Sequence, residues 1–189
     1  MTPAAALAPT AVPPTAAAPV ALRTAHADDA DAIHALIVDH LAEGHLLPRE
    51  RDEIAVHAHR FVVATTGGGT TGSGIVACAE LAPLSRDVSE VRSLVVCDDA
   101  RALGVGHHVI DELVERASTA GFEKLCAFTH APAYFVRFGF SIVPHVWLPE
   151  KILADCRTCE YFRRCGQYAM LRELRRSPQT CVPLAALHG

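Results

Sequence analysis

Apolar positions along the chain recur with two different periods, and these periods predict an order of strands and helices. Short apolar runs that are typical of strands occupy residues 20–25, 61–65, 74–81, 89–96, 124–129, 140–143 and 167–174. A first helix is expected to begin near Asp28 and Asp29 and to end at Gly44. Four apolar residues between these points have helical spacing: Ile33, Leu36, Ile37 and Leu41.

The remaining segments complete the expected set of elements. A second helix is expected from Pro48 through 51–57, with Ile54 and Val56 as candidates for its inner face. A longer helix ends at Gly121, and its apolar face consists of Val109, Ile110, Leu113, Val114 and Ala117. Shorter helices are expected at 132–138 and 148–155, and the glycine- and threonine-rich segment 66–73 predicts a hairpin loop. The early strands form a meander and the later ones alternate with helices, which predicts a mixed α/β fold of α+β character.

Composition divides the chain into three parts and narrows the possible functions. Residues 1–19 are nearly all alanine, proline and threonine and are expected to be a disordered tail, residues 20–175 one domain, and residues 176–189 a second tail. A formal net charge of −4 predicts no nucleic-acid partner and no membrane surface as partner. No apolar run is long enough to cross a bilayer, and the N-terminus lacks a secretory pattern, so a cytoplasmic protein is expected.

The stretch Arg101-Ala-Leu-Gly-Val-Gly106 lies between an apolar strand and an amphipathic helix. Glycines let a backbone approach a ligand closely, and the unpaired N–H groups at a helix start favour an anion. Arg101 can add a charged contact, so the motif predicts a pyrophosphate cradle. The alternative is a strand-to-helix turn that merely needs glycines.

The chain from Glu90 to Phe140 resembles the GNAT acetyltransferase superfamily. The resemblance rests on Val91-Arg-Ser-Leu-Val-Val96, the glycine motif, the helix after it, and Tyr134-Phe-Val-Arg-Phe-Gly-Phe140. It implies a central, mostly antiparallel twisted sheet that is flanked by helices and splays open at an acyl-CoA cleft. It also implies acetyl-CoA as co-substrate, held by Leu94, Val95, Val96, Arg101, Ala102, Leu103, Gly104, Val105, Gly106 and His107.

Four further segments are similar to the stand-alone amino-acid N-acetyltransferases of arginine biosynthesis, the N-acetylglutamate synthases. They are Gly44-His-Leu-Leu-Pro-Arg49, Glu90-Val-Arg-Ser-Leu-Val-Val96, Ala127-Phe-Thr129 and Leu148-Pro-Glu-Lys151. This resemblance implies transfer of an acetyl group to the α-amine of L-glutamate. Two alternatives stay open: another amino acid or small amine as acceptor, or a non-catalytic acyl-CoA-binding or metal-sensing module. The oligomeric state also stays open, with a homodimer as one alternative.

The resemblance also implies a role for individual residues. Arg49, Arg92 and Lys151 would bind the carboxylates of glutamate, since a guanidinium pairs with a carboxylate through two hydrogen bonds. Glu90 would be the general base that deprotonates the α-ammonium, directly or through one water. The hydroxyl of Thr129 would lie near the departing sulfur, and a backbone N–H near Leu94 or Val95 would face the developing oxyanion.

The sequence departs from its relatives at two positions. Many GNAT enzymes have a tyrosine acid five residues before the phenylalanine of the Gly-Phe pair, whereas this chain has Phe135 there and Tyr134 one place earlier. On a helix that shift turns the side chain by roughly a quarter turn, which argues against a standard tyrosine acid. Ala102 stands where the related proteins usually have glycine, which is tolerable if that residue is already helical.

Three closely spaced cysteines follow the candidate Lys151, at Cys156, Cys159 and Cys165. A Cys-x-x-Cys pair with a third cysteine suits a structural zinc ion by its spacing. Zinc needs a fourth ligand, and the candidates are His145, Glu160 and Cys181. The alternatives are cysteines that stay in the thiol form and serve packing, or a labile disulfide. The identity of any metal stays unknown.

Overall fold

The computed structural model of the chain describes residues 20–44, 46–67, 74–101 and 103–174. Its strands are β1 (Val20–Thr24), β2 (Phe61–Thr66), β3 (Ile75–Pro83), β4 (Val88–Val96), β5 (Lys124–Thr129), β6 (Ser141–Val143) and β7 (Tyr168–Glu173). Its α-helices are α1 (Ala30–Asp39), α2 (Arg51–Val56), α3 (Asp98–Arg101), α4 (Val105–Thr119), α5 (Pro132–Val136) and α6 (Pro149–Ala154). The expected tails, together with Ala102 and Cys181, lie outside the described residues.

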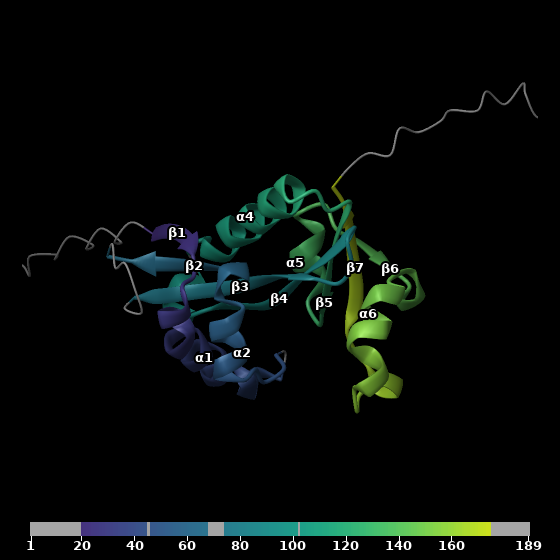
Figure 1. Ribbon diagram of the computed structural model, residues 1–189, viewed down its shortest axis with the longest axis horizontal. Helices are drawn as coiled ribbons and strands as arrows, with labels where there is room; N and C mark the ends of the chain where they lie inside the picture. The colour runs from purple at the N-terminus through teal and green to yellow at the C-terminus, as the bar shows by residue number, and fades with distance from the viewer. Residues whose placement is uncertain (1–19, 45, 68–73, 102, 175–189) are drawn as a thin grey trace, which may run out of the picture.

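The strands form one sheet of seven in the order β1-β2-β3-β4-β5-β7-β6. Every neighbouring pair is antiparallel except β4 and β5, which are parallel. Helix α4 covers one face of the sheet, and α1 and α2 cover the other (Figure 1). This arrangement confirms the predicted mixed α/β fold with a mostly antiparallel sheet.

The two faces of the sheet bury alternate residues of the same strand. In β2, Phe61 and Val63 pack with α1 and α2, while Val62 and Ala64 pack with α4. All four are fully buried. Because side chains of a strand point alternately to opposite faces, a continuous apolar run is the pattern of a strand covered on both sides.

Some expected details differ from the structure. Helix α2 begins at Arg51, so Pro48 lies in the loop before it, and Val56 is exposed rather than inward. Leu41 belongs to a separate 3-10 turn, Leu41–Glu43, because α1 ends at Asp39. Gly44 ends this turn in the left-handed conformation, as its position predicts.

In the described ranges no helix combines the length and apolarity needed to cross a membrane.

A bulge in β4 changes which side chains share a face. The register with β3 shifts by one residue between Cys78 and Glu80, where Ser93 has a φ of 50°. Before the bulge Val91 packs with α4, and after it Val95 packs with α1 and α2. Four residues apart, these two side chains would share a face in a regular strand, so the bulge inverts the alternation.

The same strand loses its other neighbour at this point. Strand β4 pairs with β5 only from Val88 to Val91, whereas its pairing with β3 continues to Val96. Strand β5 continues to Thr129 but pairs there with β7. The two central strands therefore diverge, and the backbone of residues 92–96 loses β5 as a partner on that side.

The packing of α4 on the sheet predicts a large effect of one substitution. Leu113 of α4 is fully buried, so Leu113→Ala should lower the free energy of unfolding by about 2–5 kcal/mol through lost contacts and a cavity. The same change at Leu153, which is 65% exposed, should alter it by at most about 0.5 kcal/mol. Urea denaturation of both variants checks this, and equal effects would contradict the assignment of α4 to the core.

Candidate active site

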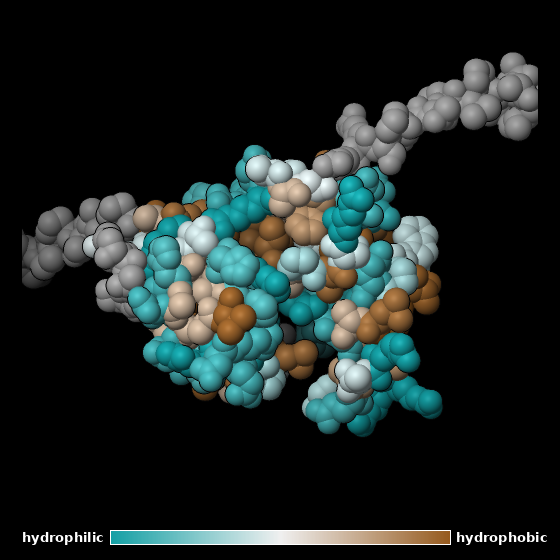
Figure 2. Space-filling model, viewed as in Figure 1, coloured by the Kyte–Doolittle hydropathy of each residue, from teal (hydrophilic) through white to brown (hydrophobic). Residues whose placement is uncertain are grey.

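The divergence of β4 and β5 opens a cleft of about 950 Å³. Its walls come from β4 and β5, from the loop before α2, from the start of α4, and from α5 and α6. Figure 2 shows this face of the molecule hollowed between the α1–α2 side and α6. All the sequence-predicted site residues with described side chains except Leu103 and Val105 line this cleft.

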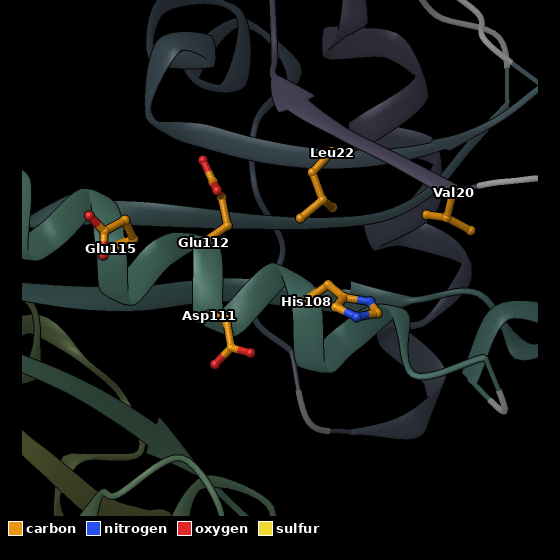
Figure 3. Close-up of a pocket in the computed structure, with 6 residues that line it drawn as sticks. All are labelled: Val20, Leu22, His108, Asp111, Glu112 and Glu115. Atoms are coloured by element: carbon orange, nitrogen blue, oxygen red, sulfur yellow. The ribbon is translucent and has the colours of Figure 1, made fainter.

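A second groove lies between β1 and α4 and is a poorer candidate. Figure 3 shows Val20 and Leu22 of β1 beside four residues of α4: His108, Asp111, Glu112 and Glu115. No lysine or arginine is among the six residues that line it, so it offers little to a pyrophosphate or a carboxylate. The cleft at β4 is therefore the candidate site.

Glu90 and Arg92 face the same side of β4 because they are two residues apart before the bulge. Lys151 reaches them from α6. The residue before this helix, Leu148, is buried in one apolar cluster with Val88 of β4. The Nζ atom of Lys151 lies 2.7 Å from Oε1 and 2.9 Å from Oε2 of Glu90. Arg92 donates through Nε to Oε2 of Glu90 at 2.5 Å. Two cations thus hold one buried carboxylate in the cleft wall.

Asp155 completes this cluster from the end of α6. Its Oδ2 atom accepts hydrogen bonds from Lys151 Nζ, at 2.8 Å, and from Arg92 Nη2. Burial acts to lower the pKa of Arg92, but Glu90 and Asp155 outweigh it and raise that pKa above its usual value. Arg92 therefore stays a cation in the cleft.

Arg49 enters the cleft from the loop before α2 and is anchored on acidic side chains. It donates to Glu80 Oε2 and to Glu53 Oε1, each at 2.9 Å, and to Ser93 Oγ at 3.3 Å. Glu80 is buried on β3 directly opposite Arg92. The contact with Ser93 ties Arg49 to the bulge, where the Cys78 thiol also donates to the Ser93 carbonyl at 3.6 Å.

The start of α4 contains the residues predicted to bind an anion. Gly104 has a φ of 72°, and no atom lies within 4 Å of where its Cβ would be, so the loop is open at this point. The N–H groups of His107 and His108 donate to the Gly104 carbonyl, which leaves those of Val105 and Gly106 without an acceptor inside the helix, and no acidic residue lies in the first turn. These features fit a pyrophosphate better than a turn that merely needs glycines.

Gly106 has a reason to be glycine besides ligand approach. A Cβ there would lie 2.6 Å from the Tyr134 hydroxyl and 3.2 Å from Val96 Cγ2. The residue is buried under this aromatic ring. The missing side chain of Gly106 therefore makes room for α5 to pack on α4, while the residue also lines the cleft.

Two other cofactor candidates already have partners within the chain. Arg101 contacts Glu43 at 2.6 Å and Asp98 at 3.2 Å, and donates through Nε to the Val96 carbonyl at 3.1 Å. His107 lies 3.3 Å from Asp111. Arg101 thus links the glycine loop to the turn after α1, and a contact between its guanidinium and a phosphate would compete with these acids.

The adjacent residues Tyr134 and Phe135 of α5 have their side chains in different places. Phe135 is buried and packs on Phe140 with ring centroids 5.3 Å apart, while the hydroxyl end of Tyr134 lies over Gly106. Burial raises the pKa of the Tyr134 hydroxyl. Thr129, at the end of β5, accepts a hydrogen bond from the Ala131 N–H at 3.0 Å. Both hydroxyl residues line the cleft.

The cysteine trio follows α6 as free thiols. Cys156 and Cys159 belong to one 3-10 turn, in which the Cys159 N–H donates to the Cys156 carbonyl at 3.2 Å. The candidate ligand His145 is stacked on Phe128 and lies 3.0 Å from the Gln167 carbonyl. Among the described residues, potential ligands for a metal gather in threes only at His40, Glu43 and Asp98. The zinc hypothesis therefore gains no support from the structure.

Sequence reasoning missed two acidic residues of the site, Glu80 and Asp155. Glu80 carried a weak signal, because a glutamate inside the apolar run 74–81 needs a buried partner. Asp155 follows Lys151 by four residues, a spacing that places both on one face of a helix. Neither signal identifies the partners across the sheet.

Comparison with known proteins identifies similar chains. A sequence family described as the acetyltransferase (GNAT) family matches residues 29–140, more than half of the chain. An uncharacterized N-acetyltransferase from Chlorobaculum tepidum is 28% identical over 158 residues, which cover 84% of this chain and 99% of the relative. An amino-acid acetyltransferase from Neisseria meningitidis is 29% identical over 141 residues, which cover 74% of this chain and 31% of the relative.

A solved structure shows the same arrangement of elements. It is N-acetylglutamate synthase from Neisseria gonorrhoeae, complexed with coenzyme A and N-acetyl-glutamate, with 27% identity and a TM-score of 0.72. The match covers 84% of this chain and 36% of that one. The chain thus spans about a third of the length of both Neisseria proteins.

The contact between Gly106 and Tyr134 can be tested by a double-mutant cycle. Gly106→Ala should destabilise the protein by about 1–3 kcal/mol through overpacking against the hydroxyl. In a Tyr134→Phe background the cost should be smaller, because the nearest remaining ring atom, Cζ, lies 3.7 Å from the added methyl group. The gain in helix propensity is the same in both backgrounds and cancels. Free energies of unfolding of the four proteins measure the coupling, and a cost that is equal in both backgrounds contradicts the contact.

Proposed function

The chain belongs to the acetyltransferase (GNAT) family and is an N-acetyltransferase, and we propose that it transfers the acetyl group of acetyl-CoA to the α-amine of L-glutamate. The observation that carries the proposal is the convergence of Glu90, Arg92 and Lys151 on the splayed edge of β4. They lie in the same cleft as the open glycine loop of α4. The Neisseria gonorrhoeae synthase that binds coenzyme A and N-acetyl-glutamate supports this choice of ligands.

The binding of acetyl-CoA would depend on backbone more than on side chains. The N–H groups at the start of α4 would hold the pyrophosphate, with Gly104 leaving room for it. The unpaired edge of β4, residues 94–96, would contact the pantetheine arm. Arg101 would add charge to the loop only if the phosphate replaces Glu43 or Asp98 as its partner.

The chemistry needs a base for the amine and a donor for the oxyanion. Glu90 would accept a proton from the α-ammonium, directly or through one water, and the free amine would attack the thioester carbon. A backbone N–H near Leu94 or Val95 would stabilise the oxyanion as it forms. The carbon–sulfur bond then breaks, and CoA leaves readily because the pKa of its thiol is only about 8.5, with the Thr129 hydroxyl as a hydrogen-bond donor to the sulfur. The nitrogen gives up its second proton as the amide forms, and the sulfur takes up a proton to leave as the thiol. No covalent enzyme intermediate is needed.

Carboxylate recognition would come from Arg49, Arg92 and Lys151. Arg49 is positioned by Glu80 and Glu53, and the other two cations lie at Glu90. A dicarboxylate can span two such cationic points.

A second acceptor class has one observation in its favour. Each of the three cations is already paired with carboxylates of the chain. A less acidic amino acid would therefore enter the cleft at a lower electrostatic cost than glutamate does. The non-catalytic alternative is dropped, since the family is one of acetyltransferases. A location in the cytoplasm and assembly into a homodimer remain predictions.

The proposed reaction is tested by CoA release from acetyl-CoA against a panel of amino acids and small amines. L-glutamate should give the highest kcat/KM, because its two carboxylates can contact two of the cationic points at once. Release with another amine but not with glutamate would sink the glutamate claim and leave the family assignment intact.

The role of Glu90 is tested in the same assay. Glu90→Gln should lower kcat by about 10²–10⁴-fold, because the base is lost, while binding of acetyl-CoA changes little. Glu115→Gln, the same change on the exposed side of α4, is the matched control and should leave kcat unchanged. A Glu90→Gln enzyme with near wild-type kcat would remove Glu90 from the mechanism.

Arg49 and Arg51 form a matched pair for the carboxylate claim. Arg49→Lys should raise the KM for glutamate about 10-fold or more, since lysine cannot reproduce the two-pronged contact. Arg51→Lys should leave the KM unchanged, because Arg51 pairs with Asp31 outside the cleft. Equal KM values in both variants would argue against Arg49 as a substrate contact.

A further inference from the structure

The cluster of Glu90, Arg92 and Lys151 in the cleft has a fourth member, Asp155, which the sequence analysis did not predict. Glu90 and Asp155 supply two carboxylates, and Arg92 and Lys151 supply two cations. The formal charges of the four groups cancel. The cations assigned above to an acceptor carboxylate are thus fully neutralised by the chain itself.

The two carboxylates differ in how firmly they are held. The Glu90 side chain is 3% exposed, lies on a central strand, and contacts Lys151 through both oxygens. The Asp155 side chain is 39% exposed, lies just beyond the last turn of α6, and bridges both cations through Oδ2 alone. Of the two, Asp155 is the carboxylate that another carboxylate can replace.

The position of Asp155 also runs against the local rule for helices. A carboxylate at the C-terminal end of a helix faces the negative end of its dipole and is disfavoured there. What holds the Asp155 side chain in place is therefore the pair of cations, Lys151 one turn earlier on α6 and Arg92 on β4. Conflicts of this kind between a local preference and the observed structure are expected at functional sites.

We propose that Asp155 is a specificity-determining residue, whose carboxylate competes with the acceptor's side-chain carboxylate for Arg92 and Lys151. Asp155 thereby weakens the binding of dicarboxylates relative to amino acids with neutral side chains. The proposal rests on the proposed function in one respect, namely that Arg92 and Lys151 face the acceptor. It predicts that loss of the Asp155 charge shifts selectivity toward the more acidic ligand.

The test compares L-glutamate with L-glutamine, which differ only in the side-chain carboxylate and amide. Calorimetric titration with CoA present measures their affinities for the wild type and for Asp155→Asn. Asp155→Asn should bind L-glutamate about tenfold more tightly, because one negative charge a few ångströms away is removed, while affinity for L-glutamine changes by less than about twofold. Glu160→Gln makes the same charge change at an exposed site nearby and should alter neither affinity.

Asp155→Glu and Asp155→Ser complete the set. Asp155→Glu keeps the charge and should keep the wild-type ratio of the two affinities, whereas Asp155→Ser should behave as Asp155→Asn does and replaces it if asparagine impairs folding. Equal changes for glutamate and glutamine, or weaker glutamate binding in the neutral variants, would overturn the proposal. Such a result would assign Asp155 to the support of Lys151 alone.

The result of the Asp155 binding test can be distinguished from the result of the CoA-release assay that tests the proposed function. A wild type that releases no CoA with glutamate refutes the glutamate claim, but a gain of glutamate binding in Asp155→Asn over the wild type would still establish the competition. If neither protein binds glutamate, both statements fail. If the wild type turns over glutamate and Asp155→Asn binds it no better, only the inference fails.

Discussion

The site depends on one constraint in the sheet: β4 can keep only one of its two neighbours beyond Val91. Its ladder with β3 continues to Val96 across a bulge, while its parallel ladder with β5 stops after four residue pairs. The separation of these strands creates the cleft and leaves β4 backbone without its β5 partner there. The bulge at Ser93 also determines which side chains face which layer, because it inverts the alternation along β4. Glu90 and Arg92 precede it and so face α6, from which Lys151 and Asp155 reach them.

The electrostatics of the cleft follow from this geometry. Arg92 and Lys151 stabilise a carboxylate, Glu90, that would be costly to bury alone. Asp155 then neutralises what remains of their charge. The arrangement fits an enzyme that must hold a base in place and still distinguish acceptors by their charge. The start of α4 fulfils a separate task, because its open loop and unpaired N–H groups favour an anion without any net charge from side chains.

Much of this could be predicted from the sequence, and the exceptions have physical reasons. The strands were predictable because both faces of the sheet are covered, which gives long apolar runs such as 61–65 and 124–129. The candidate cations and Glu90 were placed by resemblance, and the structure brings them together. Asp155 was missed because its partner Arg92 lies 63 residues away on a strand, and local patterns carry no information on contacts between distant elements. The contact of Gly106 with Tyr134 was missed for a related reason, since Tyr134 comes from a different helix.

A crystal structure of the protein with CoA and N-acetyl-L-glutamate tests the central claim most directly. The account predicts the pyrophosphate at the first turn of α4, the acetyl group beside β4 near Leu94 and Val95, and the two carboxylates of the product at Arg49 and at Arg92 with Lys151. It further predicts that Asp155 has moved away from at least one of Arg92 and Lys151. A product whose carboxylates contact none of the three cations, or whose acetyl group lies away from Glu90, would contradict the account.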